Sequence, residues 1–183
     1  MMTASSSIIY LILSAFQFII LLRFICQAMN VNYYNPVTQS IVKLSGYLLK
    51  PFEIIGFKLN SYLLFIVLYS FTFLKIYLPL LANSQVYPLD SLSIISFGYL
   101  IRDLLHIYWY LVIISAIKSW FSVFVNHPIF ALIDELCEPL YNFIRTVIPS
   151  VSGIDFSPVI ILVGLQILEI VFIPRIFNLT SML

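Results

Sequence analysis

The chain has 183 residues, of which 62% are hydrophobic and only 9% are charged, and its mean hydropathy is +1.06. This composition excludes an ordinary soluble domain, in which about 25% of the residues are charged. The formal net charge of +1 excludes a nucleic-acid-binding surface, because phosphate binding needs clustered basic residues. The sequence therefore predicts an integral membrane protein that binds no nucleic acid.

Four apolar segments have the length of about 20 residues that a membrane-crossing helix needs. They lie at about 8–28, 61–81, 98–118 and 158–177. The first lacks the positively charged start and the small-residue cleavage pattern of a signal peptide, so it is predicted to be a span.

The first two spans are joined by a long apolar connection, and so are the last two. Polar side chains recur every three or four residues over about 40–57 and about 129–148, while apolar side chains fill the remaining positions. Both stretches are predicted to be amphipathic helices that lie at the membrane interface or are re-entrant. The middle connection, 82–97, is predicted to be an ordinary short loop.

The order of span, proline-containing turn, amphipathic helix and span occurs twice. Asn35-Pro36 and His127-Pro128 stand at equivalent places, 92 residues apart (127 − 35). We therefore predict an all-α protein of two repeats, residues 1–90 and 91–183. Each repeat crosses the membrane an even number of times, so the two are expected to be parallel repeats.

The basic residues favour one orientation in the membrane. Six lie on the side of the amphipathic connections and three lie towards the other side. The two groups are Arg23, Lys43, Lys50, Lys58, Lys118 and Arg145, against Lys75, Arg102 and Arg175. Because cytoplasmic segments carry an excess of Lys and Arg, the amphipathic connections are predicted to lie in the cytoplasm and both termini outside.

Polar side chains also occur inside the predicted spans, where a charge costs about 2.5–3.5 kcal/mol on insertion scales. Arg102, Asp103 and His106 lie close together in the third span, and Gln166 and Glu169 lie three apart in the fourth. In one interpretation these residues form a proton or ion relay. In the other, Arg102 pairs with Asp103 near the membrane edge, His106 packs against a neighbouring helix, and Glu169 finds a hydrogen-bond partner.

The stretch GIDFSP leads into the fourth span. Asp155 or Ser157 can cap the first N–H groups of the helix, and Pro158 suits its first turn, where a missing N–H costs nothing. The alternative is that Asp155 pairs with Arg145 and fixes the second amphipathic helix against the fourth span.

The sequence contains no nucleophile–base arrangement, phosphate-binding glycine loop or metalloprotease motif. Cys26 and Cys137 lack the spacing of a metal site, and the two histidines are isolated from each other. The protein is therefore predicted to be no enzyme and to hold no cofactor or metal.

Six short motifs are spread along almost the whole chain. They are LLRFICQ with Arg23 and Gln27, NYYNP with Asn35 and Pro36, the pair Ser119-Trp120, EPL with Glu138 and Pro139, IRTVIP with Arg145 and Pro149, and GIDFSP with Gly153, Asp155, Ser157 and Pro158. Together these motifs resemble the YggT family of small bacterial membrane proteins. The first unit departs from the family's pattern, with Gly46-Tyr47 in place of Asp-Pro and Glu53-Ile54 in place of Arg-Arg.

The resemblance implies a function without catalysis. Members of the family are linked to osmotic-stress tolerance, to cell division and envelope organisation, and, in chloroplast relatives, to cytochrome assembly through haem attachment. The resemblance therefore implies a scaffold or assembly factor in the bacterial cytoplasmic (inner) membrane, whose partners are the lipid bilayer, other membrane proteins and further copies of itself. The alternative is a small oligomeric channel or transporter whose path is lined by Arg102, His106, Gln166 and Glu169.

Overall fold

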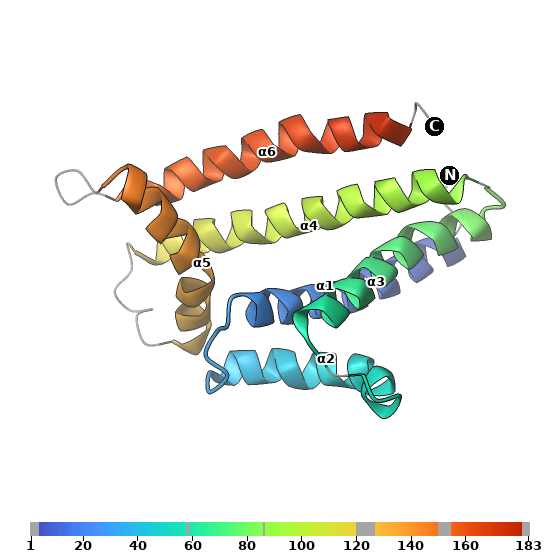
Figure 1. Cartoon of the computed structure of the whole chain (residues 1–183), viewed down its shortest axis with the longest axis horizontal. Coiled ribbons are helices and arrows are strands. Elements are labelled where there is room, and N and C mark those ends of the chain that lie inside the picture. Colours follow the sequence, from blue (N-terminus) through green and yellow to red (C-terminus); the bar gives the residue numbers. More distant parts are fainter. Residues whose placement is uncertain (1–3, 58, 86, 120–126, 150–154, 181–183) are drawn as a thin grey trace.

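The computed structural model describes residues 4–57, 59–85, 87–119, 127–149 and 155–180, except for the side chains of 179 and 180. Within these residues the chain forms helices and no strand, as the all-α prediction requires (Figure 1). The helices are α1 (Ala4–Ala28), α2 (Pro36–Ile54), α3 (Ser61–Ala82), α4 (Leu89–Lys118), α5 (Pro128–Val147) and α6 (Ser157–Thr180).

Four of the helices, α1, α3, α4 and α6, are long and apolar enough to cross a membrane. Each contains one of the predicted spans, so the chain has the helices of an integral membrane protein. One prediction is wrong, because much of the expected loop 82–97 is helical and α4 begins at Leu89, nine residues before the predicted start (98 − 89). Two serines of this stretch bond to the backbone of their own helix. Ser93 Oγ donates to the Leu89 carbonyl at 2.7 Å, and Ser96 Oγ donates to the Leu92 carbonyl at 2.6 Å.

The two shorter helices begin with the same arrangement, a side-chain cap followed by a proline. Asn35 Oδ1 accepts a hydrogen bond from the Val37 N–H at 2.9 Å, and His127 Nδ1 accepts one from the Ile129 N–H at 3.3 Å. A proline follows each cap, in the first turn, where its missing N–H leaves no bond unmade. At its other end, α2 stops three residues before the predicted end (57 − 54), next to Gly56, which adopts a positive φ of 93°.

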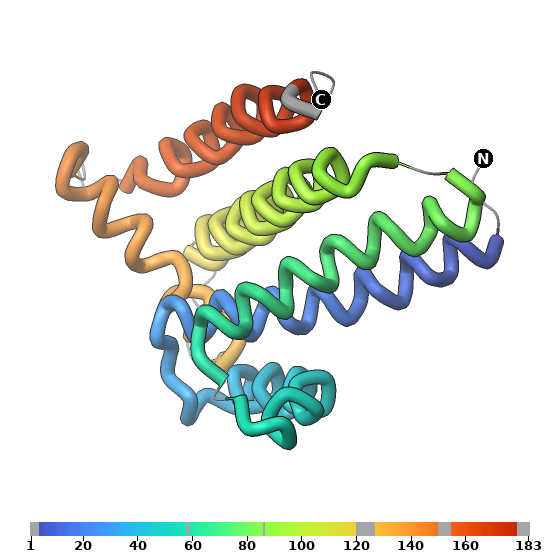
Figure 2. The backbone as a smooth tube through the Cα atoms, turned by 45° about the vertical axis from the view of Figure 1, so that its right-hand side comes forward, coloured from blue at the N-terminus to red at the C-terminus, as the bar shows by residue number. Residues whose placement is uncertain are grey.

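Both short helices lie at one end of the bundle. Figure 1 shows α2 and α5 at the end where α1 and α4 finish and α3 and α6 begin, and it marks both termini at the opposite end. α1 packs on α3, α4 packs on α6, and α3 and α4 join these two pairs. α2 packs on α1, and α5 packs across α4 and α6, as Figures 1 and 2 both show. This order agrees with two units, whose division at residue 90 and whose symmetry stay predictions.

The largest apolar core occupies the half of the bundle near the short helices. Ile20, Leu64 and Leu68 are fully buried between α1 and α3. Leu49 of α2 and Leu136 of α5 belong to the same core, at the end where the short helices lie. Large apolar side chains cover the outside of the four long helices, as is expected where a protein faces hydrocarbon.

Gly98 of α4 lets α6 approach closely. A Cβ at this position would lie 2.8 Å from Phe177 Cε1 and 3.0 Å from Ile176 Cγ2, whereas a Cβ on Gly164 of α6 would meet nothing within 4 Å. We expect Gly98→Val to lower the stability of the protein in detergent by about 1–3 kcal/mol, the usual cost of overpacking. Thermal unfolding followed by circular dichroism measures this. Gly164→Val is the control, and an equal loss in both variants would contradict the close α4–α6 contact.

Candidate functional site

A buried ion pair joins the two helix pairs at mid-length. Lys75 Nζ of α3 lies 2.9 Å from Asp103 Oδ2 of α4, and Gln17 Nε2 of α1 donates to the same oxygen at 2.8 Å. Only 5% of the Lys75 side chain is exposed. Because a charge is costly at this depth of a membrane, the pair fixes α4 against both α1 and α3.

A second group of polar side chains joins α4 to α6. Arg102 Nε donates to Glu169 Oε1 at 3.3 Å, and His106 Nε2 lies 2.8 Å from the same oxygen. The side chains of Arg102 and His106 are each 41% exposed and that of Glu169 is 31% exposed. We call these three residues the α4–α6 polar cluster.

Arg102 and Asp103 therefore do not pair with each other, as one of the two interpretations had them do. Neighbouring residues of a helix point in different directions, so Arg102 turns towards α6 and Asp103 towards α1 and α3. The same interpretation placed His106 against a neighbouring helix and gave Glu169 a hydrogen-bond partner, and in the structure His106 of α4 contacts Glu169 of α6. Gln166 is exposed on α6 and has no hydrogen bond within the described part of the chain.

Lys75 was not among the predicted site residues. It lies seven residues before the end of α3 (82 − 75) and was counted among the basic residues towards the outer side of the membrane. The signal that identifies it is a lone lysine well inside an apolar segment, which needs an acidic partner on another span. Asp103 is such a partner.

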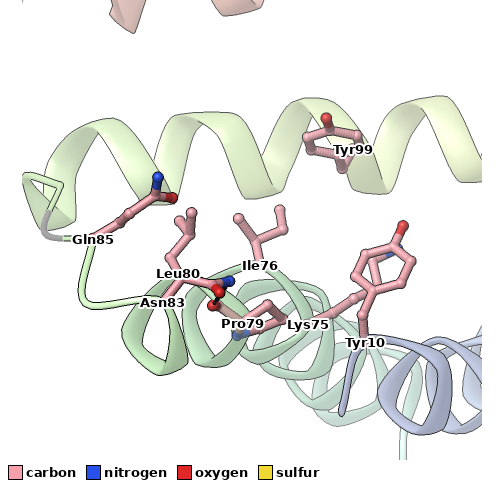
Figure 3. A pocket seen from close by; sticks show the side chains of 8 residues that line it. All are labelled: Tyr10, Lys75, Ile76, Pro79, Leu80, Asn83, Gln85 and Tyr99. Atoms are coloured by element: carbon pink, nitrogen blue, oxygen red, sulfur yellow. Dashed lines mark hydrogen bonds between the residues drawn. The ribbon is translucent and has the colours of Figure 1, made fainter. Parts of the chain in front are cut away.

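Two adjoining cavities lie beside the ion pair. The first, of about 400 Å³, is shown in Figure 3, with Tyr10 and Lys75 towards one end and Asn83 and Gln85 towards the other. The second, of about 370 Å³, is also lined by Tyr10 and Lys75 and reaches Asp103, His106 and Tyr110. Beyond it, towards the short helices, lies the largest buried apolar core.

The motif residues of the second unit meet at the junction of α4, α5 and α6. Arg145 Nε and Nη2 donate to Asp155 Oδ2 at 3.0 and 2.6 Å, and Arg145 Nη1 lies 3.6 Å from Glu138 Oε1. Asp155 Oδ1 accepts from the Ser157 N–H at 2.8 Å at the start of α6, where Pro158 follows. Asp155 thus both caps α6 and ties it to α5.

These residues surround a cavity of about 500 Å³, which we call the α5 cavity. Besides the Arg145–Asp155 pair it is lined by Glu138, by Tyr141 and by Lys118, which pairs with Asp134. Hydrogen bonds from Ser157 and Arg145 hold the pKa of the Asp155 carboxyl below its ordinary value, and the bonds to Asp155 raise the pKa of Arg145. Burial raises the pKa of the Cys137 thiol, on the buried side of α5, to about 12, so this thiol is neutral.

The NYYNP turn of the first unit lies against α5 of the second unit. Asn35 Nδ2 donates to the Pro128 carbonyl at 2.7 Å, and the Asn32 N–H donates to Glu135 Oε2 at 2.6 Å. The turn before α2 is therefore hydrogen-bonded to α5 at two points.

The remaining motif residues take no part in these two sets of contacts. The Arg23 guanidinium lies 5.7 Å from the centre of the Tyr33 ring, and its buried Nε and Nη1 have no hydrogen-bond partner among the described residues. Gln27 Nε2 donates to the Leu59 carbonyl at 3.4 Å. Pro36 begins α2, Pro139 is exposed within α5, Pro149 is exposed just after α5, and Trp120 and Gly153 lie outside the described residues.

Comparison with known proteins relates this arrangement to a family. The model of the CCB3/YggT family matches residues 94–176. An uncharacterized protein of Haemophilus influenzae is 32% identical over 149 residues, which are 79% of this chain and 77% of that protein. This chain belongs to the CCB3/YggT family.

Two further relatives extend the match within the CCB3/YggT family. The uncharacterized protein PA0392 of Pseudomonas aeruginosa is 29% identical over 98% of this chain and 93% of its own length. The uncharacterized protein YggT of Escherichia coli (strain K12) is 29% identical over 86% of this chain and 83% of its own length. No solved structure matches the chain at comparable significance.

The part that matches the CCB3/YggT model contains both polar arrangements of the second unit. Residues 94–176 include the α4–α6 polar cluster and all the charged residues around the α5 cavity. Gln17 and Lys75, the partners of Asp103, lie in the first unit and outside this match.

Removing Lys75 tests the ion pair. We expect Lys75→Met to destabilise the protein in detergent by about 3 kcal/mol, because the carboxylate of Asp103 then stays in place without its cation. This is the lower end of the usual range, since 31% of the Asp103 side chain is exposed. Adding Asp103→Asn keeps an acceptor for Gln17 and removes the unpaired charge, so the double variant should regain most of the loss. Thermal unfolding of the single and the double variant measures this recovery. Equal stabilities of these two variants would contradict a charged, paired Asp103.

Two substitutions at Asp155 separate its two roles. Asp155→Asn keeps an oxygen for the Ser157 N–H but loses the charge, and should cost about 0.2–1 kcal/mol, as exposed ion pairs do. Asp155→Ala also loses the cap and should cost about 1 kcal/mol more. Chemical unfolding of the two variants side by side measures the difference. Equal losses would show that Asp155 does not cap α6.

Proposed function

We propose that this CCB3/YggT protein is a scaffold or assembly factor without catalytic activity, which binds other membrane proteins of the bacterial inner membrane at the end formed by α2 and α5. The observation that carries the proposal is the α5 cavity with its paired charges, on a helix that also exposes large apolar side chains. Phe143 and Val147 of α5 are each 68% exposed in the last turns of the helix, on the side opposite Arg145. Such a combination provides an apolar contact and a polar rim, which together are typical of a protein interface.

The charges around the α5 cavity are suited to recognition. A group that transfers protons needs a pKa near the working pH, whereas the pKa values of Asp155 and Arg145 are shifted away from neutrality. The contribution of the pair to stability is present above the ordinary carboxyl pKa of about 3.9 and is lost only as the pH falls through the lowered value. The pair is therefore intact at cellular pH and offers fixed hydrogen-bonding groups to a partner.

The balance of charge indicates what the partner carries. Three carboxylates line the α5 cavity against two cations, Lys118 and Arg145. Each cation pairs closely with one carboxylate, which leaves Glu138 with a single longer contact, 3.6 Å from Arg145, and a side chain that is 53% exposed. The partner segment is therefore expected to present a lysine, an arginine or backbone N–H groups to Glu138.

The distribution of cations supports a cytoplasmic position for this end. Lys75 and Arg102 are paired well inside the lengths of α3 and α4 and do not mark either membrane surface. Among the described residues, Arg175 then remains near the end with the termini. Arg23, Lys43, Lys50, Lys118 and Arg145 lie towards the α2–α5 end. Because cytoplasmic segments are enriched in Lys and Arg, this distribution favours α2 and α5 in the cytoplasm.

Photo-cross-linking in native bacterial membranes tests the scaffold proposal. With a photoreactive amino acid at Phe143, we expect a discrete adduct with another membrane protein, which Glu138→Lys should weaken about tenfold or more through like-charge repulsion. Glu53→Lys is the matched control, because it inverts an exposed acidic residue of α2 away from the α5 cavity and should leave the adduct intact. A photoreactive residue at Leu11, which is 69% exposed on α1, reports contacts with lipid alone. Adducts that persist in Glu138→Lys at normal protein level would contradict the proposal.

A channel or transporter is the second candidate, and the cavities beside Lys75 and Asp103 favour it. The apolar core beyond them is the reason for preferring the scaffold. The two are distinguished by purified protein in liposomes, which as a scaffold should carry no more potassium, sodium or proton flux than empty vesicles. Flux that is present in the wild type and lost in Glu169→Ala would replace the scaffold by a transport function.

A further inference from the structure

The α4–α6 polar cluster is partly exposed near mid-length of two helices that are long and apolar enough to cross a membrane. Arg102 and His106 lie near the middle of the 30-residue α4, and Glu169 lies near the middle of the 24-residue α6. Where such a side chain faces the hydrocarbon of a membrane, the surrounding lipid chains neither donate nor accept hydrogen bonds. Charged residues inside a membrane are normally turned towards other protein groups. We therefore expect another protein surface to cover the exposed part of the cluster.

Within one copy, Arg102 and Glu169 use only part of their hydrogen-bonding capacity. A guanidinium has five N–H donors, and only the Nε group of Arg102 has an acceptor among the described residues. On the other side, Glu169 Oε1 receives both Arg102 and His106, while no donor reaches Glu169 Oε2 in the described chain. The cluster thus offers unused donors and an unused acceptor at the same depth.

The surface around the cluster is open and broad enough for another helix. α6 packs on α4 and α5 and has no extended contact with α1 or α3 in the described chain, and Figure 2 shows it at the edge of the bundle. On α6, one turn from Glu169, Gln166 is exposed, and it is flanked by Val163 and Ile170, which are 52% and 66% exposed. On the other side of α4, His106 borders the cavity of about 370 Å³.

We propose that this face of α4 and α6 is the interface of a homodimer, in which a second copy covers the α4–α6 polar cluster about a two-fold axis along the membrane normal. A two-fold interface brings the same patch of both copies together, so that residue i meets residue j and j meets i. The patch carries both signs of charge on adjacent helices at one depth. Arg102 of each copy can therefore donate to Glu169 of the other, which meets both unused capacities at once.

The self-complementary charge is the reason for choosing a second copy over a different protein. A foreign helix would have to provide an acceptor for Arg102 and a donor for Glu169 in the matching places, whereas a copy of this chain provides both by symmetry. The dimer does not depend on the proposed scaffold function, because its interface lies at mid-length of the bundle and the α5 cavity lies at one end.

Charge inversion in two differently tagged copies tests the dimer. R102E makes the patch acidic and E169R makes it basic, so each variant alone should self-associate about tenfold or more weakly than the wild type in liposomes, measured by energy transfer between labelled copies. When the two variants are co-expressed, opposite patches face each other and the two tags should co-purify. A role of these residues only inside one copy does not produce this selective pairing.

Two further measurements keep the test decisive if the single variants fold poorly. The double variant R102E/E169R restores the pairing within and between copies and should be a dimer with the thermal stability of the wild type. Copies with Q166C should be joined to each other by a thiol-reactive cross-linker long enough to span the width of two helices, since the native Cys26 and Cys137 are buried.

Each result supports or overturns the dimer. A monomeric wild type in liposomes would overturn it, and so would a folded double variant that stays monomeric or a co-expressed pair whose tags separate. Cross-links from Q166C to a different membrane protein, with none between copies, would assign this face to that protein instead. Failure of the cross-linking at Phe143 leaves these results unaffected, so the two proposals can fail separately.

Discussion

Two consecutive residues of α4 determine how the long helices are arranged. Asp103 faces Lys75 and Gln17 on one side, and Arg102 faces Glu169 on the other. Between helices in a membrane the hydrophobic effect provides no preference for one neighbour over another, so packing and polar contacts decide which helices meet. Because an unpaired charge at this depth is costly, the two pairs exclude rotations and shifts of α4 that would separate them. The close contact at Gly98 then sets how near α6 can come.

The two units differ in the polar contacts that they provide. The second unit carries Glu138, Arg145 and Asp155 around the α5 cavity, whereas the first has Gly46 and Glu53 where the family resemblance places an acidic and a basic residue. The first unit instead contributes a hydrogen-bonded turn that holds α5 in place, and a lysine that neutralises Asp103. Its altered motif therefore agrees with a supporting role for the half that the family model does not match.

The sequence predicts the helices well and their contacts poorly. Apolar length locates the four long helices, because this signal is local. The Asn-Pro pair was assigned to a turn before a helix at about 40, whereas α2 already begins at Pro36, and α5 begins at Pro128, one residue before its predicted start. The first nine residues of α4 were missed, since serines that bond to their own helix look like loop residues. The partners of Arg102 and Asp103 depend on the rotation and depth of four helices. The spacing within one helix shows which side chains share a face but not which neighbour that face meets.

The proposed partner site at the α5 cavity and the proposed dimer interface at the α4–α6 polar cluster together have a consequence. A two-fold axis along the membrane normal keeps the two copies in the same orientation, so both α5 cavities face the same side of the membrane. A partner with two binding segments, or two partners held at a fixed distance, would then engage both cavities. Linked sites bind more tightly than either alone, because the second contact forms within an existing complex. Weak single contacts at an exposed cavity, such as Glu138 would make, become sufficient for assembly when the charges at mid-length hold two copies together.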